Sequence, residues 1–344
     1  MSILINKCIK EFINNKSETY NDFEFNKTFY EGLTHQIKLA NESNGWFTSS
    51  NIYFALEGWA NLLTNNNLKE WIHNQLPDIN TNPKTVALIL AGNIPLVGFH
   101  DLICVLLSGH KAAIKLSSQD LFLMQWMIRK LCEIEPAFID QIDVCEQLKV
   151  MDAVIATGSN NTARYFDYYF GKYPHIIRKN RTSVAILNGK ETDTELMKLG
   201  KDVFTYFGLG CRNVSKIWVP QDYHFLNLLD LWASFTKVAD NFKYHNNYEY
   251  NKSIYLVNGV NYLDTGFLLL TESEALTSPI SVLYYQQYQN LTEVDQYLTQ
   301  NQDKIQCVVS SQSSRNFIPF GQTQVPDISD YADGMDVMRF LSTL

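Results

Sequence analysis

The segment TVALILAGNIP, residues 85–95, decides how the chain is interpreted. Its first six residues are threonine or apolar, which is typical of a short strand buried on both faces of a sheet. The strand leads into a turn that contains glycine, asparagine and proline. The apolar segment 96–107 that follows includes His100 and Asp101, so it is too polar and too short to cross a membrane. We therefore expect a buried strand, a tight turn and a buried helix.

Strand and helix patterns alternate beyond this turn. Strands are expected at residues 112–116, 153–156 and 183–187, and helices at 118–132, 136–147, after Ser159 and at 191–207. This alternation is the pattern of a parallel sheet with crossover helices. A second α/β unit begins near Cys211, with strands expected at 217–219, 254–257, 267–270, 282–285 and 305–309, helices at 225–240 and 294–300, and a polar, tyrosine-rich loop at 244–251.

The composition argues against several classes of protein. The formal net charge is -8, from 28 basic and 36 acidic residues, and no long basic block occurs, so nucleic acid is not an expected partner. The six cysteines are far apart and lack metal-ligand spacing, so we expect reduced thiols and no metal site. The first residues lack the apolar core of a secretory signal, and no membrane span is expected, which favours a cytoplasmic protein.

Cys211 lies in the segment FGLGCRNVSKIWVP, residues 207–220. Two glycines let the backbone turn tightly and place the thiol on a bend, just before an apolar, β-branched run. Arg212 and Lys216 supply positive charge nearby, which stabilises a thiolate and favours a nucleophile. The alternative is a structural cysteine, because unpaired cysteines commonly fill hydrophobic cores.

Other candidate residues lie where predicted strands end. Asn93 follows the first strand, and its amide can donate a hydrogen bond to a developing oxyanion. Lys115 lies near the end of the next strand, where it can bind a ribose hydroxyl or a phosphate. Gly158 and Ser159 join a strand to a helix, whose free N–H groups and positive dipole end favour a phosphate. Each of these positions, taken alone, is equally typical of a turn, a helix cap or a solvated lysine.

These residues occur in an order that resembles the aldehyde dehydrogenase superfamily. That superfamily has an Asn in a proline-containing loop, a Lys at the end of the next strand, a Gly-Ser helix start and then a Cys. The counterparts in this chain are Asn93-Ile94-Pro95, Lys115, Thr157-Gly158-Ser159 and Cys211, and Phe320-Gly321 is similar to the closing loop of the superfamily. The Ala91–Pro95 and Lys115–Ser117 segments look most like LuxC-type acyl-CoA reductases, which make fatty aldehydes. The resemblance spans about residues 83–340.

The resemblance implies an α/β, aldehyde dehydrogenase-like fold with two Rossmann-like parallel-sheet domains and a helical N-terminal region. A length of 344 residues also favours two domains over one. The expected parts are a helical N-terminal region at 1–82 packed on the cofactor domain, a nucleotide-binding domain at 83–206, a catalytic domain at 207–325 and a segment at 326–344 that returns to the first domain. An active site is expected in the cleft between the two domains.

One departure from the superfamily favours reduction. Its hydrolytic members carry a Glu before the cysteine that activates water, but no Asp or Glu occurs between Tyr168 and Lys190. Without that base, a thioester on Cys211 survives until hydride arrives. His175 is an alternative base or a structural residue. The basic residues Arg178, Lys179 and Arg181 either meet nucleotide phosphates or form a solvated face.

A second departure concerns the cofactor. The acidic residue that usually follows the cofactor lysine by three positions, and that holds the adenine ribose of NAD, is Ser118 in this chain. A carboxylate at that position repels a 2′-phosphate, so its absence favours NADPH. The resemblance also implies a Glu just before Ser278-Pro279 that holds the nicotinamide-side ribose. Glu274 lies one residue from that place.

The resemblance implies NADPH-dependent reduction of a long-chain acyl-CoA to an aldehyde through a Cys211 thioester, with Asn93 and the Cys211 N–H holding the oxyanion. An acyl-transferring protein is a possible partner, and an oligomer is possible. Two alternatives remain at this point. One is an acyl-phosphate or aldehyde dehydrogenase of the same superfamily, and the other is a non-catalytic, nucleotide-binding partner subunit.

Overall fold

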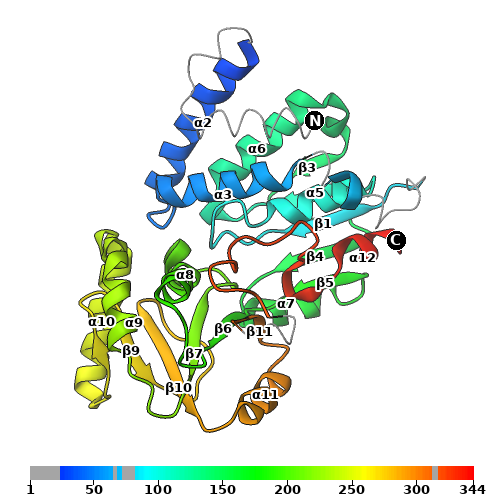
Figure 1. Ribbon diagram of the computed structural model, residues 1–344. Coiled ribbons are helices and arrows are strands. Elements are labelled where there is room, and N and C mark those ends of the chain that lie inside the picture. The colour runs from blue at the N-terminus through cyan, green and yellow to red at the C-terminus, as the bar shows by residue number, and fades with distance from the viewer. Residues whose placement is uncertain (1–23, 65–67, 72–81, 312–316) are drawn as a thin grey trace. The chain divides into compact units, whose positions relative to one another are not determined.

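The structure is a computed structural model that describes residues 24–64, 68–71, 82–311 and 317–344. The remainder of the expected N-terminal helical region, at 1–23, 65–67 and 72–81, lies outside the described residues. The chain divides into two compact units. Unit 1 contains the chain up to Lys179 together with Asp327–Leu344, and unit 2 contains Asn180–Pro326. Each unit is built on its own sheet, which can be followed in Figure 1.

The sheet of unit 1 has five parallel strands in the order β3-β2-β1-β4-β5. They are β1 (Thr85–Ile89), β2 (Lys111–Lys115), β3 (Ile142–Val144), β4 (Ala153–Thr157) and β5 (His175–Arg178). The middle residues of β1 and β2 and most of β4 are buried, because side chains pack on both faces of the sheet. This burial explains why the sequences of these strands are apolar throughout.

The two faces of this sheet are covered differently (Figure 1). Val86 and Leu88 point into a large core formed with α2 (Glu24–Ser43), α3 (Ser49–Leu62), α5 (Phe99–Leu107), α6 (Leu121–Ile134) and α12 (Val337–Ser342). Ala87 and Ala156 point to the opposite face, where α7 (Asn160–Phe170) packs. Because α12 belongs to the C-terminal segment, the core of unit 1 is assembled from both ends of the described chain.

The structure of unit 1 differs from the prediction at two places. The expected helix at 136–147 is a short 3-10 helix, Pro136–Asp140, followed by β3. Pairing with β2, in which Ala113 lies opposite Asp143, makes this segment an edge strand. β5 was not expected, because a strand of four residues that begins with histidine and ends with arginine gives a weak pattern.

The sheet of unit 2 has six strands in the order β11-β6-β7-β10-β9-β8. They are β6 (Thr182–Ile186), β7 (Val214–Pro220), β8 (Leu263–Asp264), β9 (Leu269–Glu272), β10 (Val282–Tyr288) and β11 (Ile305–Ser310). All pairs are parallel except β8 with β9. The helices are α8 (Asp193–Phe204), α9 (Leu226–Trp232), α10 (Phe242–Asn258) and α11 (Leu291–Gln300). Among the described residues, no helix is long and apolar enough to cross a membrane.

The expected domain boundary between residues 206 and 207 falls inside unit 2. β6 lies between β7 and β11 and pairs with both, so it belongs to the sheet of unit 2. Helix α8 packs on the hydrophobic core of the same sheet. The boundary observed from contacts lies at Lys179 and Asn180.

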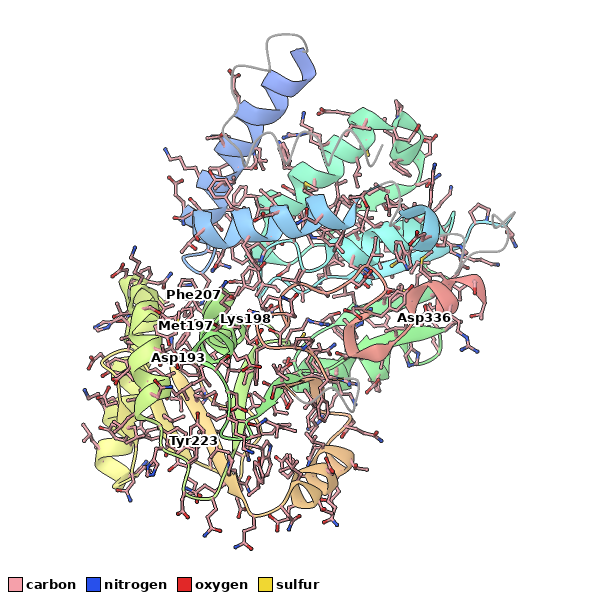
Figure 2. The ribbon with its side chains drawn as sticks, in the orientation of Figure 1. Asp193, Met197, Lys198, Phe207, Tyr223 and Asp336 are labelled. Carbon is pink, nitrogen blue, oxygen red and sulfur yellow. The ribbon has the colours of Figure 1, made fainter. Side chains whose placement is uncertain are left out.

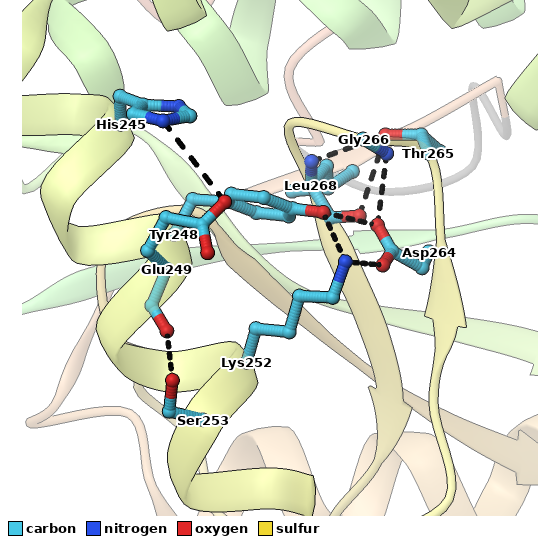
Figure 3. A network of polar contacts seen from close by, with 9 residues as sticks. All are labelled: His245, Tyr248, Glu249, Lys252, Ser253, Asp264, Thr265, Gly266 and Leu268. Carbon is cyan, nitrogen blue, oxygen red and sulfur yellow. Dashed lines mark hydrogen bonds and ion pairs between the residues drawn. The ribbon is translucent and has the colours of Figure 1, made fainter.

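The expected loop at 244–251 and the expected strand at 254–257 are wrong, because both lie inside α10. Asn241 begins this helix by accepting hydrogen bonds from two backbone N–H groups, and Gly259, with φ of 64°, ends it. Figure 3 shows how the helix is tied to β8. Tyr248 donates to Asp264 at 2.7 Å, and Lys252 Nζ lies 2.8 Å from the same carboxylate. These contacts join the helix to the next strand, 16 residues on from Tyr248, which is beyond the reach of a local pattern.

Candidate active site

The segment that carries Cys211 begins where α8 ends. Tyr206, Phe207 and Gly208 have φ of 54°, 59° and 78°, so three successive residues adopt the left-handed conformation. Residues other than glycine are strained in this conformation, and such strain is often found at functional sites. Tyr206 is buried, and the ring of Phe207, labelled in Figure 2, lies 6.0 Å from that of Tyr244 on α10. These packed side chains support the strained turn.

Asn213 holds the other end of the segment. Its side chain is buried, and its Nδ2 donates to the carbonyl oxygens of Asp202 and Thr205 at 3.0 and 2.8 Å. Its Oδ1 accepts a hydrogen bond from the backbone N–H of Gly210 at 2.8 Å. The backbone on both sides of Cys211 is therefore fixed by one amide side chain.

Cys211 occupies the bend between these anchors. Its carbonyl oxygen accepts a hydrogen bond from Ser183 Oγ at 3.0 Å, which ties the bend to the start of β6. The Cys211 residue is half-buried, whereas Cys104 and Cys307 are buried. A half-buried cysteine on a rigid bend is compatible with nucleophilic attack, whereas a cysteine that only fills a hydrophobic core would be fully buried.

The segment that resembles a closing loop is tied to the end of α8. The buried carboxylate of Asp202 accepts hydrogen bonds from the backbone N–H of Gly321 at 2.6 Å and from Thr323 Oγ1 at 2.8 Å. Arg212 Nε donates to the carbonyl oxygen of Thr323. The hydrogen bond from Arg212 therefore holds the Cys211 bend to the closing loop.

Lys216 is fully buried on β7 and is held by polar and aromatic groups. Its Nζ donates to Gln286 Oε1 at 2.6 Å and to the carbonyl oxygen of Glu274 at 3.0 Å. The ammonium also lies 4.8 Å from the ring centroid of Trp218 and 5.1 Å from that of Tyr297. Burial lowers the pKa of Lys216 to about 8. Lys216 thus anchors the backbone of the segment that carries Glu274, whose side chain is exposed.

In unit 1, the segment Ala91–Leu96, called here the Asn93 loop, follows β1. The side chain of Asn93 is exposed. Leu96 is buried with φ of 57°, and its N–H donates to Asp120 Oδ2 at 2.7 Å. A Cβ on Gly92 would lie 2.5 Å from Ser117 Oγ, so glycine is needed for the loop to approach the segment Lys115–Asp120. This segment is called here the Lys115 turn.

The predicted cofactor residues of unit 1 lie at one edge of its sheet. Lys115 ends β2 and is exposed, and Ser118 is exposed in the Lys115 turn. Ser159 caps α7, with its Oγ accepting a hydrogen bond from the backbone N–H of Thr162 at 3.2 Å, and Gly158 precedes it. β2, β1 and β4 are parallel neighbours, so these residues and the Asn93 loop share the carboxyl edge where α/β sheets bind ligands. Cys211 and Glu274 belong to unit 2.

The basic residues do not form the group that the sequence suggested. Arg178 is buried and makes a bidentate ion pair with Asp101 at 2.6 and 2.9 Å. The carboxylate of Asp101 neutralises its charge. Arg178 is therefore neither a phosphate ligand nor part of a solvated face. Arg181 belongs to unit 2 and donates to the carbonyl oxygen of Ile305 in the same unit. His175 begins β5, at the amino end of a parallel strand and thus at the opposite edge from the Asn93 loop, which argues against its role as a base there.

Three residues that build the site were not expected from the sequence. Asn213 holds the Cys211 bend, Asp202 holds the closing loop, and Asp120 holds the Asn93 loop. Asp202 had a visible signal, because it lies among the apolar residues that α8 buries. Asp120 immediately precedes α6 and looks like an ordinary helix cap.

Comparison with known proteins bears on the family and the fold of this chain. The chain matches the family model "Acyl-CoA reductase (LuxC)" over residues 4–225. No curated protein sequence matches the chain.

Similar solved structures are aldehyde dehydrogenases. A variant of indole-3-acetaldehyde dehydrogenase AldA from P. syringae, in complex with NAD+, has a TM-score of 0.61 at 12% identity over 91% of this chain and 72% of that chain. Aldehyde dehydrogenase 21 from Physcomitrella patens, in complex with succinate, has a TM-score of 0.64 at 8% identity over 99% and 84%. GapN from Methanocaldococcus jannaschii, complexed with NADP, has a TM-score of 0.58 at 11% identity over 92% and 82%. At these identities the likeness shows a common fold.

Proposed function

Because the chain belongs to the acyl-CoA reductase (LuxC) family, we propose that it reduces a long-chain acyl-CoA to an aldehyde in an NADPH-dependent reaction. Family and fold place it among the oxidoreductases that act on acyl or aldehyde substrates. The observation that carries the finer proposal is the Cys211 bend, in which strained backbone and the Asn213 side chain present a half-buried thiol.

The reaction begins with attack of the Cys211 thiolate on the carbonyl carbon of the acyl-CoA. A carbon–sulfur bond to Cys211 forms, and the side-chain amide of Asn93 and the Cys211 N–H stabilise the oxyanion. Collapse breaks the bond to the CoA sulfur, and CoA leaves as a thiol with the proton that Cys211 lost. The acyl group is then a thioester on Cys211.

NADPH, when bound, supplies the hydride that reduces the carbonyl carbon of this thioester. Collapse of the resulting oxyanion breaks the bond to Cys211 and releases the aldehyde, which regenerates the thiolate. The absence of Asp and Glu between Tyr168 and Lys190 supports this outcome over hydrolysis, because a water molecule near the thioester then lacks the superfamily's usual base.

The carboxyl edge of unit 1 fits a dinucleotide. Exposed Lys115 can bind a ribose hydroxyl or a phosphate, and the N–H groups at the start of α7, after Gly158 and Ser159, suit the pyrophosphate. Ser118 is exposed beside Lys115 and carries no charge, which supports NADPH over NADH. Glu274 is proposed to hold the nicotinamide-side ribose.

The reaction is tested with purified protein, NADPH and acyl-CoA substrates of different chain length, by following NADPH absorbance. Wild type is expected to oxidise NADPH and to prefer long chains. Incubation with acyl-CoA alone should add one acyl group to the peptide that contains Cys211, as seen by mass spectrometry. Cys211→Ala should abolish both signals, whereas Cys145→Ala, which replaces another half-buried cysteine, should retain both. Unchanged turnover in Cys211→Ala would rule out the thioester.

The cofactor preference has its own test. Ser118→Glu places a carboxylate beside the expected 2′-phosphate and should lower the ratio of NADPH to NADH activity about tenfold or more. Gln119→Glu adds the same charge at the next exposed position and should leave the ratio unchanged. Equal ratios in the two variants would contradict the assignment of Ser118. NADPH binding by wild type without turnover would instead support the partner-subunit alternative.

A further inference from the structure

Asp120 connects two loops of unit 1 that the proposed mechanism uses separately. It is the last residue of the Lys115 turn, which carries the proposed cofactor residues Lys115 and Ser118. Its Oδ2 accepts the hydrogen bond from the N–H of Leu96, the last residue of the Asn93 loop, at 2.7 Å. The carboxyl group of Asp120 therefore links the Lys115 turn, proposed to bind the cofactor, to the Asn93 loop, proposed to bind the oxyanion.

The carboxyl group of Asp120 does not cap helix α6, although Asp120 occupies the cap position. Asp120 precedes α6 as its cap residue, yet its side chain makes no capping hydrogen bond to that helix. An aspartate at such a position usually accepts a hydrogen bond from the first turn. Here it is only 2% exposed and turns to the Asn93 loop, and its Oδ1 has no hydrogen-bond partner among the described residues.

The loop that Asp120 holds needs support. Leu96 is a non-glycine residue with φ of 57°, a conformation that persists only where surrounding structure imposes it. Its side chain is fully buried in the core of unit 1, and its N–H is fixed by Asp120. Asn93 lies three residues before this anchor, so a shift at Leu96 moves the amide proposed to bind the oxyanion.

The two loops are also in steric contact. A Cβ on Gly92 would lie 2.5 Å from Ser117 Oγ and 3.1 Å from the backbone nitrogen of Asp120. The Lys115 turn is also contacted by Asn44, whose Nδ2 donates to the carbonyl oxygen of Gln119 at 3.2 Å. Because the turn packs directly against Gly92, a shift of the turn moves the Asn93 loop.

We propose that Asp120 is a positioning residue that couples cofactor binding at the Lys115 turn to the placement of Asn93. The coupling rests on the proposed function, but the contact between Asp120 and Leu96 can be tested without turnover. A cofactor that orders the Lys115 turn then orders the Asn93 loop, and by linkage the ordered loop favours the cofactor.

The test uses Asp120→Ala, which removes the acceptor, and Asp120→Asn, which keeps an oxygen for the Leu96 N–H. Asp167→Ala, at an exposed position of α7, is the matched control. Hydrogen exchange of the Leu96 amide is measured by mass spectrometry with and without NADPH, at one pH, alongside kcat and KM.

In wild type, NADPH should slow exchange at Leu96. In Asp120→Ala, exchange without NADPH should be about tenfold faster or more, and NADPH should no longer slow it. The kcat of this variant should fall about 10- to 100-fold, the range for a displaced oxyanion donor, with KM for acyl-CoA within about threefold. Asp120→Asn should resemble wild type in all three readouts, which a loss of fold would not produce.

Wild-type exchange at Leu96 in Asp120→Ala, or an undiminished effect of NADPH in that variant, would overturn the proposal. Should Asp120→Ala not fold, Asp120→Thr, which keeps an acceptor on a shorter side chain, should show intermediate exchange, and wild-type exchange in it would overturn the proposal equally. Absence of turnover in wild type would refute the proposed function, while the exchange measurements would still decide the role of Asp120.

Discussion

Replacing Asp120 by asparagine changes how the stability of unit 1 depends on pH. Burial raises the pKa of the Asp120 carboxyl from its usual 3.8 to about 8, while the hydrogen bond from Leu96 acts in the opposite direction. The folded pKa lies above the unfolded value, so folding takes up a proton. The stability that this group contributes is fully present below about pH 4 and is lost as the pH rises to about 8.

The magnitude follows from the same shift. Each pH unit between the two pKa values lowers the free energy of unfolding by about 1.4 kcal/mol relative to a side chain that does not ionise. Wild type should therefore lose about 3 kcal/mol relative to Asp120→Asn between about pH 5 and about pH 7.5. Asparagine keeps the size of the side chain and the acceptor for Leu96, so the two proteins differ mainly in this ionisation.

The assay is urea-dependent hydrogen exchange of the β1 and β2 peptides, which reports the unfolding of unit 1 rather than of the whole chain. It is repeated across the pH range for wild type, Asp120→Asn and the control Asp167→Asn. A difference between wild type and Asp120→Asn that stays constant with pH, to within about 0.5 kcal/mol, would show that Asp120 ionises normally and would refute the reasoning. The control should show no comparable slope.

Three further substitutions test other contacts. Gly92→Ala should destabilise unit 1 by about 1–3 kcal/mol in thermal unfolding, because its Cβ would meet Ser117 Oγ at 2.5 Å, and Ser117→Gly should recover part of that loss. Arg178→Met strands the buried carboxylate of Asp101 and should cost about 3–5 kcal/mol in denaturant unfolding, with recovery when Asp101 is also replaced by leucine. The pKa of Lys216 is lowered to about 8 by burial, so folding releases a proton, and wild type should gain stability over Lys216→Met as the pH rises from about 8 to about 10, as measured by the urea midpoint. A midpoint difference that does not change with pH would contradict the lowered pKa of Lys216.

The sequence predicted the elements whose pattern is local. β1, β2 and β4 are short apolar runs between turn residues, and the structure has strands there. The helix α10 was missed because its buried residues, such as Tyr248, are polar at one end, and Tyr248 is held by Asp264, 16 residues further along the chain. Propensity and periodicity carry no information about such a partner.

The site shows the same division. Asn93, Lys115 and Cys211 were predicted as site residues because they lie at strand ends or turns, in an order that resembles the aldehyde dehydrogenase superfamily. The groups that hold them act over long separations: Gly321 donates to Asp202 across 119 residues, and Leu96 donates to Asp120 across 24. Asp202 was visible as a carboxylate in an apolar stretch, whereas Asp120 looked like a helix cap, and the partner of each becomes known only from the fold.

The assembly of the unit 1 core from both ends of the described chain bears on how the protein is made. Val337, Met338 and Leu341 are fully buried there, and the carbonyl oxygen of Leu341 lies 3.0 Å from His110 Nε2. The ribosome synthesises these residues after all of unit 2. Unit 2 can therefore fold during translation, before the core of unit 1 is complete. The Lys115 turn and the Asn93 loop are translated long before the unit that holds them is complete, and during that interval chaperones and proteases would encounter them.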